Sequence, residues 1–153
     1  MRKNWLLIGI GLVVAVLAVA AVACDDDDGG GGDGSAALMV TLSEVEGNGV
    51  TGNAILIETD IGTTRVVVSV KALPEGPHAN HLHHGTCDEQ GEVHVTLEEL
   101  QANADGDATA TTLDFAEEDP DPEFSHFASG HYVAVHEGGN DTVGAVISCG
   151  DVG

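Results

Sequence analysis

The feature that most constrains the fold is a series of short runs in which apolar or β-branched residues alternate with polar ones. "ALMVTLSEVEG" and "VTGNAILIET" are joined by Gly-Asn-Gly, which is typical of a β-hairpin. Further runs are "TTRVVVSVKAL", "EVHVTL", "DATATTLDF", "HYVAVHE" and "VGAVISCG". Seven or eight strands in about 118 residues predict an all-β domain, an antiparallel Greek-key β-sandwich or flattened barrel over residues 36–153.

Two segments of this domain lack a strand pattern. Residues 96–104, "TLEELQANA", predict a short helical turn between flanking turn residues. Residues 116–130, "AEEDPDPEFSHFASG", are acidic and contain proline, and this composition predicts an exposed loop.

The charge of the chain limits its partners. The formal net charge is −22 with only four Lys and Arg residues, and Arg65 and Lys71 are the two that lie within residues 36–153. Such a surface repels polyanions, so nucleic-acid binding is excluded.

The N-terminal segment has the pattern of an export signal. Arg2 and Lys3 precede an uncharged run over residues 5–23, and Cys24 follows at once. This resembles a bacterial lipoprotein signal, with residues 1–23 removed, lipid attached to Cys24 and the protein held at the cell membrane outside the cytoplasm. An uncleaved membrane helix and simple secretion are the alternatives. Residues 24–35, rich in Asp and Gly, predict a flexible tether.

Cys87 and Cys149 are the remaining cysteines. In an exported protein a lone pair usually forms one disulfide, and a thiolate metal site is the alternative. Closing a loop of this length would contribute about 4 kcal/mol to stability by the chain-entropy estimate.

Histidines are the candidate functional residues. Five of the eight lie between Gly76 and His94. On a strand His81 and His83 point to one face, roughly 6–7 Å apart, so both rings can reach one ion. His136 ends the run "HYVAVHE" on the face of Tyr132. Imidazole donors suit copper and zinc, whereas an exposed polar pair is the non-functional alternative.

Three segments together resemble the copper/zinc superoxide dismutases. They are "VKALPEGPHANHLHHGTC", "LQANADGDATATTLDF" and "YVAVHEGGNDTVGAVISCGDVG", and they occur in the order found in that family. The resemblance implies copper ligation by His81, His83 and His136, support of these ligands by His78, and a Cys87–Cys149 disulfide. His94 matches the family's bridging histidine with an offset of one residue, so it is either a fourth ligand or a surface-facing strand residue. His84, His126 and His131 match no ligand and are expected to be solvated.

The departures from that family define the expected function. No histidine lies between His94 and "ANADGDATATT", so the family's zinc site is not expected, and Val146 occupies the position of its anion-guiding arginine. The resemblance therefore implies a copper-only protein, either an enzyme that disproportionates superoxide to oxygen and hydrogen peroxide or a copper-sequestering protein without turnover. "ANHLHHG" and "YVAVHEG" also resemble chordin-like domains, which implies a non-enzymatic envelope module as the alternative.

Overall fold

The computed structural model describes residues 35–113 and 123–153. The predicted signal peptide, the lipidation site Cys24, the tether up to residue 34 and residues 116–122 of the predicted acidic loop lie outside this part. Within it, no helix has the length and apolar character needed to cross a lipid bilayer.

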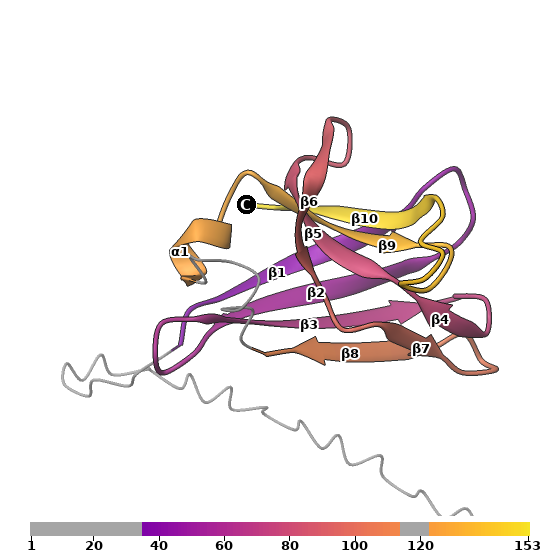
Figure 1. Ribbon diagram of the computed structural model, residues 1–153, viewed down its shortest axis with the longest axis horizontal. Helices are drawn as coiled ribbons and strands as arrows, with labels where there is room; N and C mark the ends of the chain where they lie inside the picture. Colours follow the sequence, from indigo (N-terminus) through magenta and orange to yellow (C-terminus); the bar gives the residue numbers. More distant parts are fainter. Residues whose placement is uncertain (1–34, 114–122) are drawn as a thin grey trace, which may run out of the picture. The chain divides into compact units, whose positions relative to one another are not determined.

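The described chain is almost entirely β-structure (Figure 1). Its elements in order are β1 (Ala37–Glu44), β2 (Thr51–Glu58), β3 (Thr64–Lys71), β4 (Gly76–His78), β5 (Asn80–Gly85), β6 (Gln90–Thr96), β7 (Leu100–Ala102), β8 (Ala108–Thr112), α1 (Phe124–Phe127), β9 (His131–His136) and β10 (Val146–Val152). The predicted all-β class and the predicted hairpin of β1 with β2 are confirmed.

Eight strands form one curled antiparallel sheet in the order β6-β5-β9-β10-β1-β2-β3-β8, and β4 pairs with β7 in a separate two-stranded sheet. The curl brings the β5–β9–β10 side of the sheet opposite the β1–β2–β3 side, so the sheet encloses its own core as a half-barrel (Figure 1). This is the sandwich or flattened barrel that the alternating runs predict.

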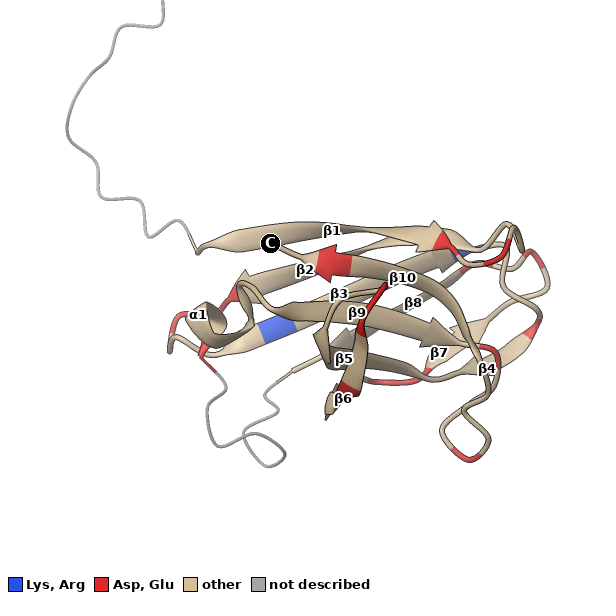
Figure 2. Ribbon diagram, turned by 90° about the horizontal axis from the view of Figure 1, so that it is seen from above, with Lys and Arg blue, Asp and Glu red and all other residues tan. Residues whose placement is uncertain are grey.

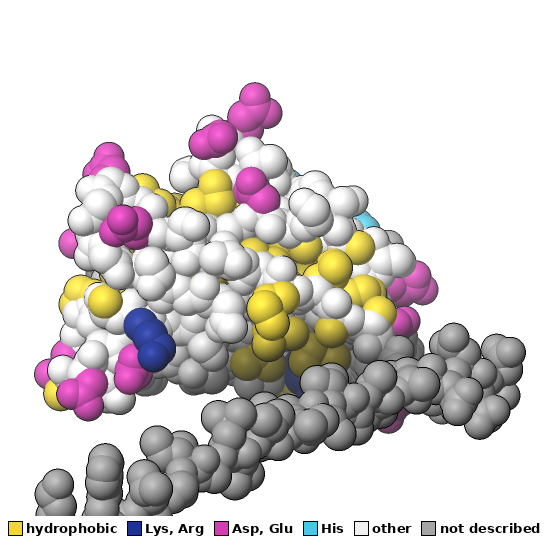
Figure 3. Space-filling view, turned by 180° about the vertical axis from the view of Figure 1, so that it is seen from behind, with side chains coloured by type: hydrophobic (Ala, Val, Ile, Leu, Met, Phe, Trp, Pro, Cys, Tyr) yellow, Lys and Arg dark blue, Asp and Glu magenta, His cyan; other side chains and the backbone are white. Residues whose placement is uncertain are grey.

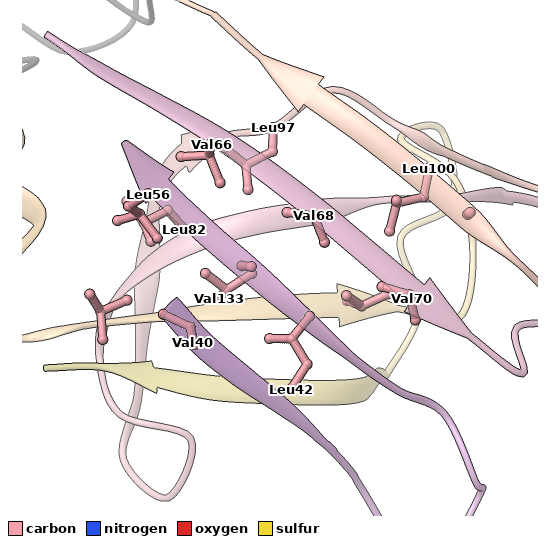
Figure 4. Close-up of a cluster of buried hydrophobic side chains, with 14 of the residues drawn as sticks. Val40, Leu42, Leu56, Val66, Val68, Val70, Leu82, Leu97, Leu100 and Val133 are labelled. Carbon is pink, nitrogen blue, oxygen red and sulfur yellow. The ribbon is translucent and has the colours of Figure 1, made fainter. Parts of the chain in front are cut away.

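The core follows from the period-2 pattern of the strands. Every second residue of β3 is buried, at Val66, Val68 and Val70. Figure 4 shows these side chains meeting Leu82 of β5 and Val133 of β9 across the interior. Full burial of each such side chain contributes about 1.5–3 kcal/mol. The side chains of Leu82 and Val133 mark the inner face of β5 and β9, and their neighbours in sequence point outward.

Two expectations are wrong. The predicted helical turn in residues 96–104 is the short strand β7, which pairs with β4 through Leu100 opposite His78. The predicted exposed loop contains α1 where the structure describes it, and Phe127 of that helix is completely buried. In both places apolar side chains reach the core, and their burial outweighs the polar local composition.

The predicted disulfide is confirmed. Cys87 and Cys149 are bonded, with Cα atoms 6.0 Å apart and a sequence separation of 62. Cys149 lies on β10 beside Ala134 of β9, and it packs against Tyr132 and Ala134. The bond therefore fixes the β5–β6 loop to the strand that supports the outer face of β9.

Acidic residues lie mainly on turns and strand ends, as Figure 2 shows, and they project around the edge of the face seen in Figure 3. Arg65 and Lys71 both belong to β3. The strands that carry histidines, β4, β5, β6 and β9, thus contain no Lys or Arg.

Candidate metal centre

The pairing of β5 with β9 brings three predicted ligands together on the outer face. His81 lies opposite Ala134 and His83 opposite Tyr132, so these four residues share one face. His136 continues that face two residues beyond Ala134, and its amide nitrogen bonds to the carbonyl of Ala79 at 2.9 Å. His81, His83 and His136 each offer a ring nitrogen, and these nitrogens lie within 4.8 Å of one another. We call these three residues the outer cluster.

The nitrogen spacing suits a small ion. Nδ1 of His81 is 3.1 Å from Nε2 of His136. Two imidazole nitrogens bound to one tetrahedral ion at 2.0–2.1 Å would be about 3.3 Å apart. Ring centroids are 4.9 Å apart for His81 and His136, and 5.6 Å apart for His81 and His83. The rings therefore converge on a common point.

Backbone carbonyls select the tautomer of two of these rings. Nδ1 of His83 donates to the carbonyl of Gly91 at 3.1 Å, and Nδ1 of His136 donates to the carbonyl of Gly144 at 3.3 Å. Because a carbonyl only accepts, the proton of each neutral ring sits on Nδ1 and the lone pair on Nε2. Nε2 of His83 is buried and has no hydrogen-bond partner among the described residues. A buried, unpaired lone pair is costly in a finished core but is what a metal ligand requires.

Burial disfavours the charged form of two histidines of the outer cluster. The three side chains are only 6–7% exposed. Burial, followed by the proximity of His136 and His83, lowers the pKa of His81 to about 4. Burial also lowers the pKa of His136, opposed by its hydrogen bond to Gly144. The charged form of His81 and of His136 is therefore disfavoured at neutral pH, so on neither ring does a metal ion compete with a second ring proton.

Neighbouring residues hold the outer cluster in place. His78, predicted to support the ligands, is buried with Nδ1 2.9 Å from the carbonyl oxygen of His136 and Nε2 2.8 Å from that of Pro74. The ring of Tyr132 stacks on His83 at 4.8 Å. These contacts restrict the positions of His136 and His83.

His94 does not join the outer cluster. Pairing of β5 with β6 runs from Leu82 opposite Val95 to His83 opposite Val93, so β6 carries His94 as an extra residue at this step. Such a bulge re-aims a side chain, and it turns His94 towards the side of the buried Val95. Of the two interpretations of His94, the structure does not support that of a fourth ligand beside His81, His83 and His136.

A second cluster forms on the inner side instead. His84 lies opposite His131 on the face of Leu82 and Val133. His84, His94 and His131 each offer a ring nitrogen within 4.8 Å of the others. We call them the inner cluster. The expectation that His131 is solvated is wrong, since it is 5% exposed, whereas His84 is exposed as expected.

The sequence contained a signal for the inner cluster, but a search for histidines two residues apart on a strand does not find it. His84 follows His83 directly, and His131 is five residues before His136. Odd separations on a strand place residues on opposite faces. The partial burial of His126, which was also expected to be solvated, follows from α1 and has no comparable sequence signal.

Comparison with known proteins shows which solved structure the fold is similar to. The sequence matches no family model and no curated protein. Among solved structures, the chain is similar to a Cu/Zn superoxide dismutase from Brucella abortus, with a TM-score of 0.54 and 19% sequence identity over 77% of this chain and 100% of that chain. At this identity the likeness establishes the fold: the chain has a divergent superoxide dismutase-like fold with histidine clusters able to hold metal.

Proposed function

We propose that the outer cluster binds copper and that the protein is a copper-binding member of the cell envelope with superoxide as its substrate. The observation that carries this proposal is the convergence of three buried imidazoles from β5 and β9, one of them with an Nε2 that has no partner among the described residues. An all-imidazole set favours copper, which also stands highest among the divalent ions in affinity for such donors.

The residues of this site have separable tasks. His81 presents Nδ1, and His83 and His136 present Nε2, to one point. Gly91 and Gly144 fix two tautomers through their carbonyls, and His78 holds the backbone of His136. A bound copper ion would supply the one-electron chemistry, cycling between Cu(II) and Cu(I) while one superoxide is oxidised to oxygen and a second is reduced to hydrogen peroxide. All eight histidines lie in the described residues, and none besides these three reaches the point of convergence, so protons would come from solvent.

One observation favours copper storage without turnover as the second candidate. By the family resemblance, Val146 occupies the position of the anion-guiding arginine. Val146 lies opposite His136 in the sheet. Arg65 and Lys71 are on β3, at the other side of the sheet. With a net charge of −22, the protein would repel superoxide as it approaches. This predicts slow turnover that rises with ionic strength.

The location outside the cytoplasm, with a lipid on Cys24, belongs to the same proposal. Its support is the leader pattern of residues 1–23 and the Cys87–Cys149 disulfide, since structural disulfides persist in oxidising compartments. Mass spectrometry of the protein isolated from membranes tests it by the mass of a lipid-modified N-terminal Cys24.

Metal content and superoxide decay, measured on the same purified protein, test the function. We expect one copper ion per outer cluster, its loss in His81→Ala, and its retention in His84→Asn, which alters the adjacent residue on the other face. Superoxide decay that depends on bound copper supports the enzyme, and copper binding without faster decay supports storage. Equal copper content in wild type and His81→Ala would contradict both.

A further inference from the structure

The inner cluster gathers imidazoles from three strands at one end of the sheet. His84 lies near the end of β5, His94 lies in the bulge of β6 and His131 begins β9. The rings of His84 and His94 are stacked at 4.1 Å, and those of His94 and His131 at 5.0 Å. Three separate chain segments thus direct the same functional group to one place, although none of these residues takes part in the outer cluster.

Helix α1 brings a fourth imidazole to this place. It directly precedes β9, and its buried Phe127 packs against the rings of His94 and His131 at 5.4 and 5.6 Å. The ring of His126 lies 5.1 Å from that of His94 and 5.6 Å from that of His131. A hydrophobic side chain therefore anchors the helix in a position that holds His126 beside the cluster.

The hydrogen bonding of the inner cluster repeats that of the outer one. Nδ1 of His131 donates to the carbonyl of Ser129 at 2.9 Å, so its Nε2 carries the lone pair. Nδ1 of His94 is 2.9 Å from that Nε2. This is the same arrangement as His136 with Gly144 and His81. A backbone carbonyl that fixes the tautomer of a ring is a regular feature around metal-ligating histidine.

We propose that His84, His94 and His131 form a second metal site, for zinc, with His126 placed to complete a four-imidazole set. Four protein ligands close the tetrahedral sphere of zinc, which is typical of a structural site. The site would join β6, the edge strand of the large sheet, to β5, β9 and α1. It involves no residue of the outer cluster, so zinc binding at this site does not depend on copper binding at the other.

Zinc titration calorimetry on the purified protein tests the proposal, with His84→Asn as the main variant because His84 is exposed and its replacement leaves the core intact. To keep zinc out of the outer cluster, that cluster is first filled with Cu(I), and His81→Ala without copper provides a second background. We expect one zinc ion to bind in each background. We expect His84→Asn to weaken this binding by more than about 100-fold, the upper end of what loss of an outer-shell partner costs.

His126→Gln and a spectroscopic readout sharpen the result. We expect His126→Gln to weaken zinc by about 10-fold while three ligands remain. In nitrogen-15 NMR, zinc should shift the ring nitrogens of His84, His94 and His131 and leave His78 unchanged. No zinc binding in either background, or equal zinc affinity in wild type and His84→Asn, would overturn the proposal and leave a packed imidazole stack.

Discussion

The outer and inner clusters are built from the same parts and differ in their surroundings. Each pairs a ring fixed by a backbone carbonyl with an Nδ1 from another strand, at 3.1 Å in the outer and 2.9 Å in the inner cluster. The outer cluster is buried throughout, whereas the inner one grades from buried His131 to exposed His84. Consecutive residues His83 and His84 supply both. A single strand can therefore serve two sites because its side chains alternate between faces.

The largest expected effect comes from removing the disulfide, which packs against residues on the face of the outer cluster. Replacing Cys87 and Cys149 together by serine should lower the free energy of unfolding by about 4 kcal/mol. Cys149 packs against Tyr132 and Ala134, which share the face of the outer cluster. Copper affinity should therefore fall as well. Urea unfolding and copper titration measure the two effects. Zinc affinity of the inner cluster, which lies on the opposite face of β5 and β9, is the comparison and should fall less.

Acid should destabilise the metal-free protein through the outer cluster. In the unfolded chain a histidine titrates near 6.5, whereas the pKa of His81 in the folded protein is about 4. Between pH 6.5 and pH 4 the unfolded state binds more protons than the folded state. The contribution of His81 to the free energy of unfolding is therefore fully present above pH 6.5 and decreases by about 3 kcal/mol as the pH falls towards 4.

The matched variant for this effect is His81→Gln, which cannot take up the proton. Its unfolding free energy, measured by urea denaturation at pH 7 and pH 4.5, should fall less than that of wild type. The carboxylates and the other histidines are common to both proteins, so the difference isolates His81. An identical pH response in both proteins would show that His81 is not held neutral by burial.

A substitution at Gly91 should disturb both clusters at once. Its carbonyl accepts the hydrogen bond of His83, and a Cβ at this position would collide with the backbone carbonyl of His84. Gly91→Ala should push β6 away from β5 and cost about 1–3 kcal/mol, as overpacking does. Both copper and zinc affinity should drop. Gly47→Ala is not a matched control because its φ of +74° adds strain, so Thr109→Ala on β8 serves instead.

The smallest effect is expected at the exposed member of the inner cluster. In metal-free protein His84→Asn should change the unfolding free energy by no more than about 0.5 kcal/mol, as for other surface substitutions. Thermal unfolding with and without zinc, with the outer cluster filled by Cu(I), separates this from the metal-linked effect, since only wild type should then gain stability from zinc. A large loss without metal would mean that His84 acts in packing.

The parts of the molecule that follow from alternation could be predicted from the sequence. The strands, the Cys87–Cys149 bond and the shared face of His81 and His83 all depend on local patterns or on a count of cysteines. The meeting of His136 with this pair was suggested by a resemblance and depends on the pairing of β5 with β9, which alternation does not specify.

What escaped prediction depends on register and on tertiary packing. The bulge that redirects His94 adds one residue to β6, and the sequence "GEVHVT" gives no sign of it. Helix α1 forms in an acidic, proline-bearing segment because Phe127 reaches the core. The strand β7 forms in place of a helical turn because β4 is there to pair with it. Each outcome is decided by a partner distant in sequence.

The central claim is that imidazoles of His81, His83 and His136 meet around one copper ion. Anomalous diffraction at the copper absorption edge, from crystals of the copper-loaded protein, tests it directly. We expect a strong anomalous peak about 2.0–2.1 Å from Nδ1 of His81 and from Nε2 of His83 and His136. Copper bound elsewhere, or no anomalous peak between these three rings at full copper occupancy, would contradict it.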